Sequence, residues 1–250
     1  MSIVGNSLYH DTFHFFYKKL KFIFLISLCT ACITSYIDYL IIPDISNIYH
    51  ICTNKYLHSH SFVGLIKEMN QQQQKILFKY SIIRSVSSLI GNALLAYSTI
   101  TFVHIICTNK SFDYFLLAQD CISIFPNLFL LILLITCIIQ LGFMLLIIPG
   151  ILFCILCALS PIILITEKKN ILQSLQNSII ITTNAIKMLI SPIIIWLFFK
   201  FILLIIHSIF TFIPENILML TLNVIINLIT SILIIYLCRF YMLLPTFKII

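Results

Sequence analysis

Between Asp120 and Glu167 the chain runs for forty-six residues without one formal charge, and Pro149-Gly150 lies inside this run. A single helix of that length would extend for about 69 Å, at about 1.5 Å per residue. The hydrocarbon core of a bilayer is only about 30 Å thick. The run is therefore long enough for two crossings, and it predicts a transmembrane helical hairpin with a tight turn at Pro149 and Gly150.

The position of the proline leaves a second interpretation open. Pro149 lies past the midpoint of the run, so the returning helix, residues 151–165, has only fifteen residues. A crossing needs about 20 residues. Proline suits the first turn of a helix, where its missing N–H would be unpaired anyway. The alternative is a re-entrant hairpin, which turns within the membrane and leaves by the face it entered.

The composition excludes whole classes of function. The chain is 61% hydrophobic and 9% charged, with a mean hydropathy of +1.11, whereas soluble domains carry about 25% charged residues. No phosphate-cradling, dinucleotide-binding, zinc-protease or serine-hydrolase motif occurs in the sequence. We therefore expect no enzyme, no catalytic residues, no cofactor and no nucleic-acid partner.

We expect an all-α integral membrane protein, a bundle of about six transmembrane helices with amphipathic interfacial helices. The expected spans form one polytopic domain over residues 22–250, and they are 22–42, 82–106, 126–148, 151–165, 188–212 and 217–244. The first span should be an uncleaved signal anchor, because no small-residue cleavage site follows it. Lys and Arg favour the cytoplasmic side. Eight of them inside against five outside favour a cytoplasmic N-terminus and C-terminus.

Two segments outside these spans have helical periodicity. Residues 1–21 are expected to form a cytoplasmic amphipathic helix whose apolar side holds Tyr9, Phe13, Phe16 and Leu20. Residues 170–187 predict a second amphipathic helix on the cytoplasmic side. Residues 43–81 form the one sizeable outer loop, which is basic and carries three histidines.

A candidate intramembrane polar cluster is predicted from the cost of polar groups in lipid. Its members are Lys200, Asn92, Gln140, Asn223 and Asn227. Lys200 lies midway along the fifth expected span, where no carboxylate is expected at its depth. One interpretation is a polar cavity with Lys200 at its floor, able to hold an anionic group. The other, which we favour from the sequence, is hydrogen bonding between helices together with a snorkelling lysine.

Cysteine and histidine residues do not predict a metal site. Cys29 and Cys32, like Cys154 and Cys157, are three residues apart, but no histidine or carboxylate lies beside either pair. Small apolar side chains on one helix face explain this spacing. The remaining histidine pair, His104 and His207, is expected in opposite leaflets and so cannot ligate one haem iron. No metal or cofactor is expected.

Several stretches together resemble a known family of membrane proteins. They include Met1-Ser2-Ile3, Leu89-Ile90-Gly91-Asn92-Ala93, Gln140-Leu141-Gly142, Ile148-Pro149-Gly150-Ile151, Pro214-Glu215 and Tyr236-Leu237-Cys238-Arg239. In these stretches the chain resembles the YciC-type uncharacterised inner-membrane proteins of enterobacteria, in an isoleucine-rich version like those of endosymbionts. The resemblance runs nearly from end to end. It implies a multi-pass protein of the bacterial inner membrane and supplies no substrate and no catalytic residue.

Two hypotheses of function follow from these expectations. The first is a structural or accessory envelope protein, with the lipid bilayer and other envelope membrane proteins as partners. The alternative is a transporter or lipid-handling permease subunit with a polar cavity around Lys200. An enzyme acting on lipids ranks third, because Glu167 alone does not make an active site.

Overall fold

The structure is a computed structural model that describes residues 2–41, 70–108, 114–209 and 215–244. The predicted outer loop lies outside these residues except for its last part, from residue 70 onward. The described residues are helical, with no strand among them. The helices are α1 (Ser2–Lys18), α2 (Leu20–Ile41), α5 (Gln71–Thr108), α6 (Tyr114–Leu145), α7 (Ile147–Cys157), α8 (Ser160–Glu167), α9 (Ile171–Asn184), α10 (Ile186–Ile209) and α11 (Glu215–Met242).

Six stretches of these helices are long and apolar enough to cross a membrane. They are Leu20–Tyr39, Gln71–Thr108, Asp120–Leu145, Ile147–Glu167, Ile186–His207 and Ile217–Met242. The predicted fold class is thereby confirmed as an all-α integral membrane protein. Helix α5, with 38 residues, extends for about 57 Å and so is longer than one crossing. Its N-terminal part, from Gln71, is a polar stretch that begins with four glutamines.

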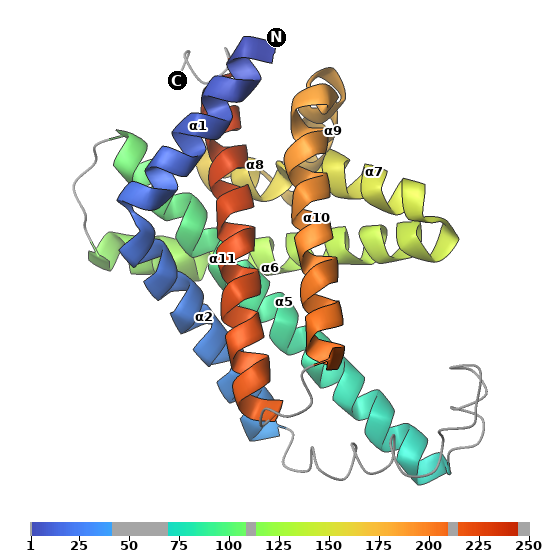
Figure 1. Cartoon of the computed structure of the whole chain (residues 1–250). Helices are drawn as coiled ribbons and strands as arrows, with labels where there is room; N and C mark the ends of the chain where they lie inside the picture. Colours follow the sequence, from blue (N-terminus) through green and yellow to red (C-terminus); the bar gives the residue numbers. More distant parts are fainter. Residues whose placement is uncertain (1, 42–69, 109–113, 210–214, 245–250) are drawn as a thin grey trace.

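The packed core lies at one end of the molecule, near α1, α8 and the start of α10 (Figure 1). Its side chains come from α1, α2, α5, α7, α8, α10 and α11, and the C-terminal part of α11 supplies Ile235 and Tyr241. Among the described residues, the opposite end holds a smaller buried cluster of Leu203, Leu218 and Leu222. The helices are thus held together at the first end and are splayed at the other.

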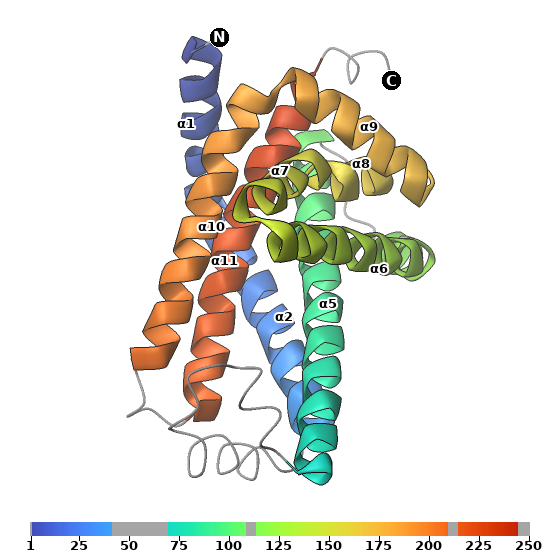
Figure 2. The same ribbon diagram turned by 90° about the vertical axis from the view of Figure 1, so that its right-hand side faces the viewer.

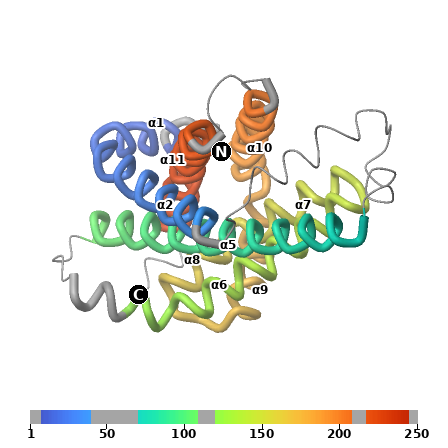
Figure 3. The backbone as a smooth tube through the Cα atoms, turned by 90° about the horizontal axis from the view of Figure 1, so that it is seen from below, coloured from blue at the N-terminus to red at the C-terminus, as the bar shows by residue number. Residues whose placement is uncertain are grey.

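Helices α6 and α7 run across the molecule. Figure 1 shows both lying crosswise to α10 and α11, and Figure 2 shows the same relation after a quarter turn. Seen from below, α5 separates α2, α10 and α11 from α6, α8 and α9 (Figure 3). The six apolar helices are therefore not one set of parallel rods.

The turn between α6 and α7 differs from the prediction at Pro149 and Gly150. The chain turns at Leu146, which has an extended backbone with φ −159° and ψ 156°. Pro149 lies in the first turn of α7, where a missing N–H loses no helical hydrogen bond. A Cβ at Gly142 would lie 2.9 Å from the Cα atom of Gly150. Gly150 therefore lies where α6 and α7 pack closely, and it is not part of the turn.

The buried side of the amphipathic helix α1 overlaps the predicted one. Tyr9 and Phe16 pack partly buried against the core, but the fully buried residues lie one position earlier. Leu8, Thr12 and Phe15 are buried, whereas Phe13 is 48% exposed. The reason is that α1 packs against α11, and the Thr12 hydroxyl donates to the Leu8 carbonyl at 2.7 Å, so this polar group is satisfied in the contact. The predicted side is rotated by one residue because the aromatic residues dominate the periodicity.

The predicted second amphipathic helix corresponds to α9, which packs against α7 and α8. Its buried side carries the hydroxyl groups of Ser174, Ser178 and Thr182 together with the apolar side chain of Leu175. Ser178 donates a hydrogen bond to the Leu156 carbonyl at 2.6 Å, and Thr182 donates to the same oxygen at 3.3 Å. The carbonyl is available because the helix breaks after α7, ahead of Pro161 in the first turn of α8.

Candidate functional site

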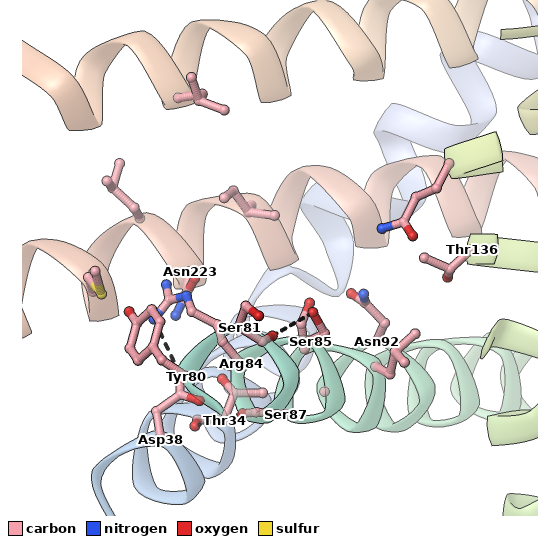
Figure 4. Close-up of a pocket in the computed structure, with 18 of the residues that line it drawn as sticks. Thr34, Asp38, Tyr80, Ser81, Arg84, Ser85, Ser87, Asn92, Thr136 and Asn223 are labelled. Carbon is pink, nitrogen blue, oxygen red and sulfur yellow. Dashed lines mark hydrogen bonds and ion pairs between the residues drawn. The ribbon is translucent and has the colours of Figure 1, made fainter. Parts of the chain in front are cut away.

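A groove of about 1810 Å³ lies between α5 on one side and α10 and α11 on the other. Helix α2 borders it at Thr34 and Asp38, and the crossing helix α6 closes it with Leu133, Thr136, Cys137 and Gln140. Figure 4 shows Arg84, Ser85 and Asn92 along α5, with Asn223 on α11 and Thr136 on α6 facing the same space. We call this space the polar groove.

All members of the predicted polar cluster line the polar groove: Lys200, Asn92, Gln140, Asn223 and Asn227. They come from four different helices, α10, α5, α6 and α11. The tertiary structure therefore brings together residues that the sequence could only place at similar depths.

Lys200 is the one cation of this cluster, and its ammonium group rests on an aromatic ring. Its Nζ atom lies 4.0 Å from the centroid of the Trp196 ring. Such a contact contributes about 0.5–2 kcal/mol, depending on desolvation. The Trp196 ring is held in turn by a hydrogen bond from its Nε1 to the Thr230 hydroxyl, at 3.2 Å. Among the described residues, Lys200 forms no ion pair.

Asn227 has a structural role at the edge of the groove. Its side-chain amide donates to the Ser27 carbonyl at 3.3 Å and to the Thr30 hydroxyl at 3.1 Å. These bonds join α11 to α2. Asn227 therefore links two helices, as one of the two interpretations of the polar cluster expects. Within the described part of the chain, no such hydrogen bond between helices is found for Asn92, Gln140 or Asn223.

An ion pair in the groove was missed by the sequence reasoning. Arg84 on α5 and Asp38 on α2 approach to 3.5 Å, with side chains 38% and 16% exposed. Neither residue belongs to the polar cluster predicted from the sequence. Only the packing of α2 against α5 shows that they meet.

Polar residues on α5 supply a signal that could have located the groove. Ser81, Ser85, Ser88 and Asn92 all line it. Their spacings of four, three and four residues place them on one helix face. A polar stripe on a helix long enough to span the membrane predicts a cavity or a neighbour on that face.

The charge of the groove favours anions. Its described lining residues include the cations Lys75, Arg84 and Lys200 and one carboxylate, Asp38. Asp38 pairs with Arg84, so its negative charge does not neutralise the charges of Lys75 and Lys200. In the parts of the chain that the structure describes, no three His, Cys, Asp or Glu side chains group as metal ligands.

The two cysteine pairs and Glu167 do not line the polar groove. Cys29, Cys32, Cys154 and Cys157 are all free thiols. Glu167 lies at the packed end, where one oxygen accepts a hydrogen bond from the Tyr241 hydroxyl and the other pairs with Lys169 at 2.5 Å. This carboxylate therefore joins α8 to α11 and lies away from the polar groove.

Comparison with known proteins places the chain in a family. The model of the uncharacterised protein family UPF0259 matches residues 1–243. A UPF0259 membrane protein of Buchnera aphidicola subsp. Acyrthosiphon pisum (strain 5A) is 40% identical over 242 residues, covering 97% of this chain and 98% of the relative. No solved structure gives a significant match.

Relatives from other bacteria match over a similar length. A UPF0259 membrane protein of Photorhabdus laumondii is 32% identical over 250 residues, covering 98% of each chain. Another from Yersinia pestis is 30% identical over 248 residues, covering 98% of this chain and 97% of the relative. The resemblance drawn from the sequence is confirmed, and so is a multi-pass membrane protein as the class. The chain belongs to the uncharacterised membrane protein family UPF0259.

Proposed function

We propose that this chain is a non-enzymatic accessory protein of the bacterial inner membrane that binds the anionic headgroup of a membrane lipid in the polar groove. The observation that carries the proposal is the position of Lys200. This cation lies on a membrane-embedded helix, lines the polar groove and has no ion-pair partner among the described residues. A lysine at the centre of a span costs roughly 2.5–3.5 kcal/mol on insertion scales. A lipid phosphate beside its ammonium group would offset that cost.

The remaining lining supports the same ligand class. The amides of Asn92, Gln140 and Asn223 can donate to phosphate and ester oxygens. The groove volume, about 1810 Å³, exceeds the ~300–1,000 Å³ of pockets for drug-sized molecules. A lipid headgroup with the first part of its acyl chains would use this larger space.

The orientation and the absence of catalysis are also part of the proposal. The distribution of Lys and Arg supports a cytoplasmic N-terminus and C-terminus, so the polar groove would open toward the outer side of the inner membrane. The names of the relatives state no enzymatic activity. Other envelope membrane proteins would be the partners of an accessory protein that presents a bound lipid.

The test compares lipid-dependent stability of the purified full-length chain. We expect phosphatidylglycerol or cardiolipin to raise the Tm in detergent more than phosphatidylcholine does, because a ligand that binds only the folded state stabilises it by mass action, about 2.7 kcal/mol at one hundred times Kd. Lys200→Met should abolish the difference between anionic and zwitterionic lipid.

The matched control is Lys79→Met, which removes the same charge from an exposed position of α5 outside the lining. This variant should keep the preference for anionic lipid. The readout is the difference between lipids, so any change of intrinsic stability in Lys200→Met does not affect it. A wild-type chain without the preference, or a preference that persists in Lys200→Met, would rule out the proposal.

A further inference from the structure

The hairpin of α6 and α7 has a polar base and an apolar tip. At the base, Asp120 and Lys168 pair at 3.2 Å, and both side chains are more than half exposed. At the tip, five consecutive large apolar residues from Met144 to Ile148 are exposed, with Met144 at 84% and Ile148 at 79%. Residues 141–148 contain no charged or hydrogen-bonding side chain.

This tip does not fit a loop in water. Exposed apolar surface is unfavourable in water in proportion to its area, and large contiguous apolar patches mark surfaces that contact a partner or a membrane. The tip would lie outside the hydrocarbon core if α6 and α7 crossed the bilayer as two full spans, because Asp120–Leu145 alone has 26 residues, or about 39 Å of helix.

The direction of the hairpin also argues against two full crossings of the bilayer. Helices α10 and α11 run between the two ends of the molecule, and α6 and α7 lie crosswise to them in two perpendicular views (Figures 1 and 2). Helix α6 and the junction of α1 with α2 are drawn at a similar height in Figure 1. The lysines at that junction, Lys18, Lys19 and Lys21, mark the cytoplasmic boundary of the membrane.

We infer that α6 and α7 form a re-entrant hairpin that lies in the cytoplasmic half of the bilayer, with its tip in the acyl chains. The base enters and leaves by the cytoplasmic face, and α2, α5, α10 and α11 are the helices that cross. Removing a pair of crossings leaves both termini on the same side. The hairpin also closes the polar groove, because Thr136, Cys137 and Gln140 of α6 line its end.

A consequence is that the groove communicates with only one side of the membrane. Its lining runs along α5 from Gln71 to Asn92 and stops at α6. A ligand can therefore enter from the outer side, or laterally from the outer half of the bilayer, and cannot leave to the cytoplasm without movement of the hairpin. This inference rests on the proposed orientation of the chain but not on lipid binding, so it would stand even if the groove bound no lipid.

Cysteine accessibility in whole cells tests the inference. In a full-length version without native cysteines, single cysteines are placed at the tip (Met144→Cys), at the base (Ser123→Cys) and at the outer end of α5 (Gln72→Cys). A membrane-impermeant maleimide should label Gln72→Cys from outside and Ser123→Cys only after the membrane is permeabilised. Met144→Cys should be labelled in neither case, and only after detergent denaturation.

Either other result at the tip overturns the inference. Labelling of Met144→Cys from outside would mean that α6 and α7 cross the membrane as two spans. Labelling only after permeabilisation would mean that the tip lies in the cytoplasm and not in lipid.

A second measurement does not depend on the cysteine-free background. In the wild-type chain, Leu145→Asp would place a charge in hydrocarbon and should reduce the amount of membrane-inserted protein by roughly tenfold or more. Ser123→Asp, at the exposed base, should leave it close to the wild-type level. Equal amounts of the two variants would contradict a tip buried in acyl chains.

Discussion

At the scale of single residues, Gly91 marks a close contact between two helices that border the groove. A Cβ atom at this position would lie 2.2 Å from Cγ2 of Thr34, so α5 and α2 approach as closely as they do only because Gly91 has no side chain. This contact lies beside the Arg84–Asp38 pair and the hydrogen bond from the Ser87 hydroxyl to the Thr34 carbonyl, at 3.2 Å. Small residues permit such close packing between membrane helices.

We expect Gly91→Ala to lower the Tm of the purified chain by several degrees. Overpacking costs typically about 1–3 kcal/mol, and each kcal/mol shifts the Tm of a chain of this size by about 2–4 °C. Thr34→Ser removes the clashing Cγ2 atom and keeps the hydroxyl, so Gly91→Ala combined with Thr34→Ser should recover most of the loss. Thermal unfolding of the four proteins in detergent measures this. A Gly91→Ala chain as stable as wild type would mean that the helices do not meet here.

Residues of the candidate site were predictable to different degrees. Lys200, Asn92 and Gln140 could be selected from the sequence because each is polar in an apolar run and lipid makes that costly. The pairing of Arg84 with Asp38 could not, since the two residues are forty-six positions apart and nothing local specifies that α2 packs on α5 at this register.

At the scale of elements, α1 shows how packing decides the buried side of a helix. The sequence predicts an apolar side that includes Phe13, but α1 docks on α11 through Leu8 and Phe15. Arg239 of α11 lies over the Phe15 ring, 4.8 Å from its centroid. The helix is therefore a part of the folded core and not only an interfacial segment.

We expect Phe15→Ala to destabilise the protein by about 3–5 kcal/mol, as is usual for truncation of a buried phenylalanine. Phe13→Ala is the matched control, because the same atoms are removed from a side chain that is 48% exposed. Chemical or thermal unfolding in detergent should separate the two variants clearly. The reverse order would indicate that α1 lies on the bilayer with Phe13 inserted, as the sequence alone suggests.

At the scale of the whole molecule, packing is concentrated at one end and the polar groove occupies the other. The large core joins α1, α8, α10 and α11, while a smaller cluster among the described residues of the opposite end contains Leu203, Leu218 and Leu222. The groove lies between α5 on one side and α10 and α11 on the other, although α5 and α11 are also in contact with each other. A protein that must hold a ligand within the membrane needs such a region of incomplete packing.

The orientation of the whole chain gives a further prediction. We expect green fluorescent protein fused to the C-terminus to be fluorescent and alkaline phosphatase fused there to be inactive, because both results require a cytoplasmic end. The same pair of fusions at the N-terminus should behave alike. An active phosphatase at either end would contradict the proposed orientation. The result is independent of the hairpin, since four and six crossings place the ends equally.

The sequence by itself determined that this protein lies in a membrane, that it is helical and approximately where its helices are. Apolar runs of sufficient length leave no other stable state in lipid, where backbone groups must be paired within the helix. Only the tertiary structure decided the direction of α6 and α7, the turn at Leu146 and the assembly of the polar groove. The reason is that an apolar helix of given length can cross a membrane or lie within it, and the choice depends on contacts with helices distant in sequence.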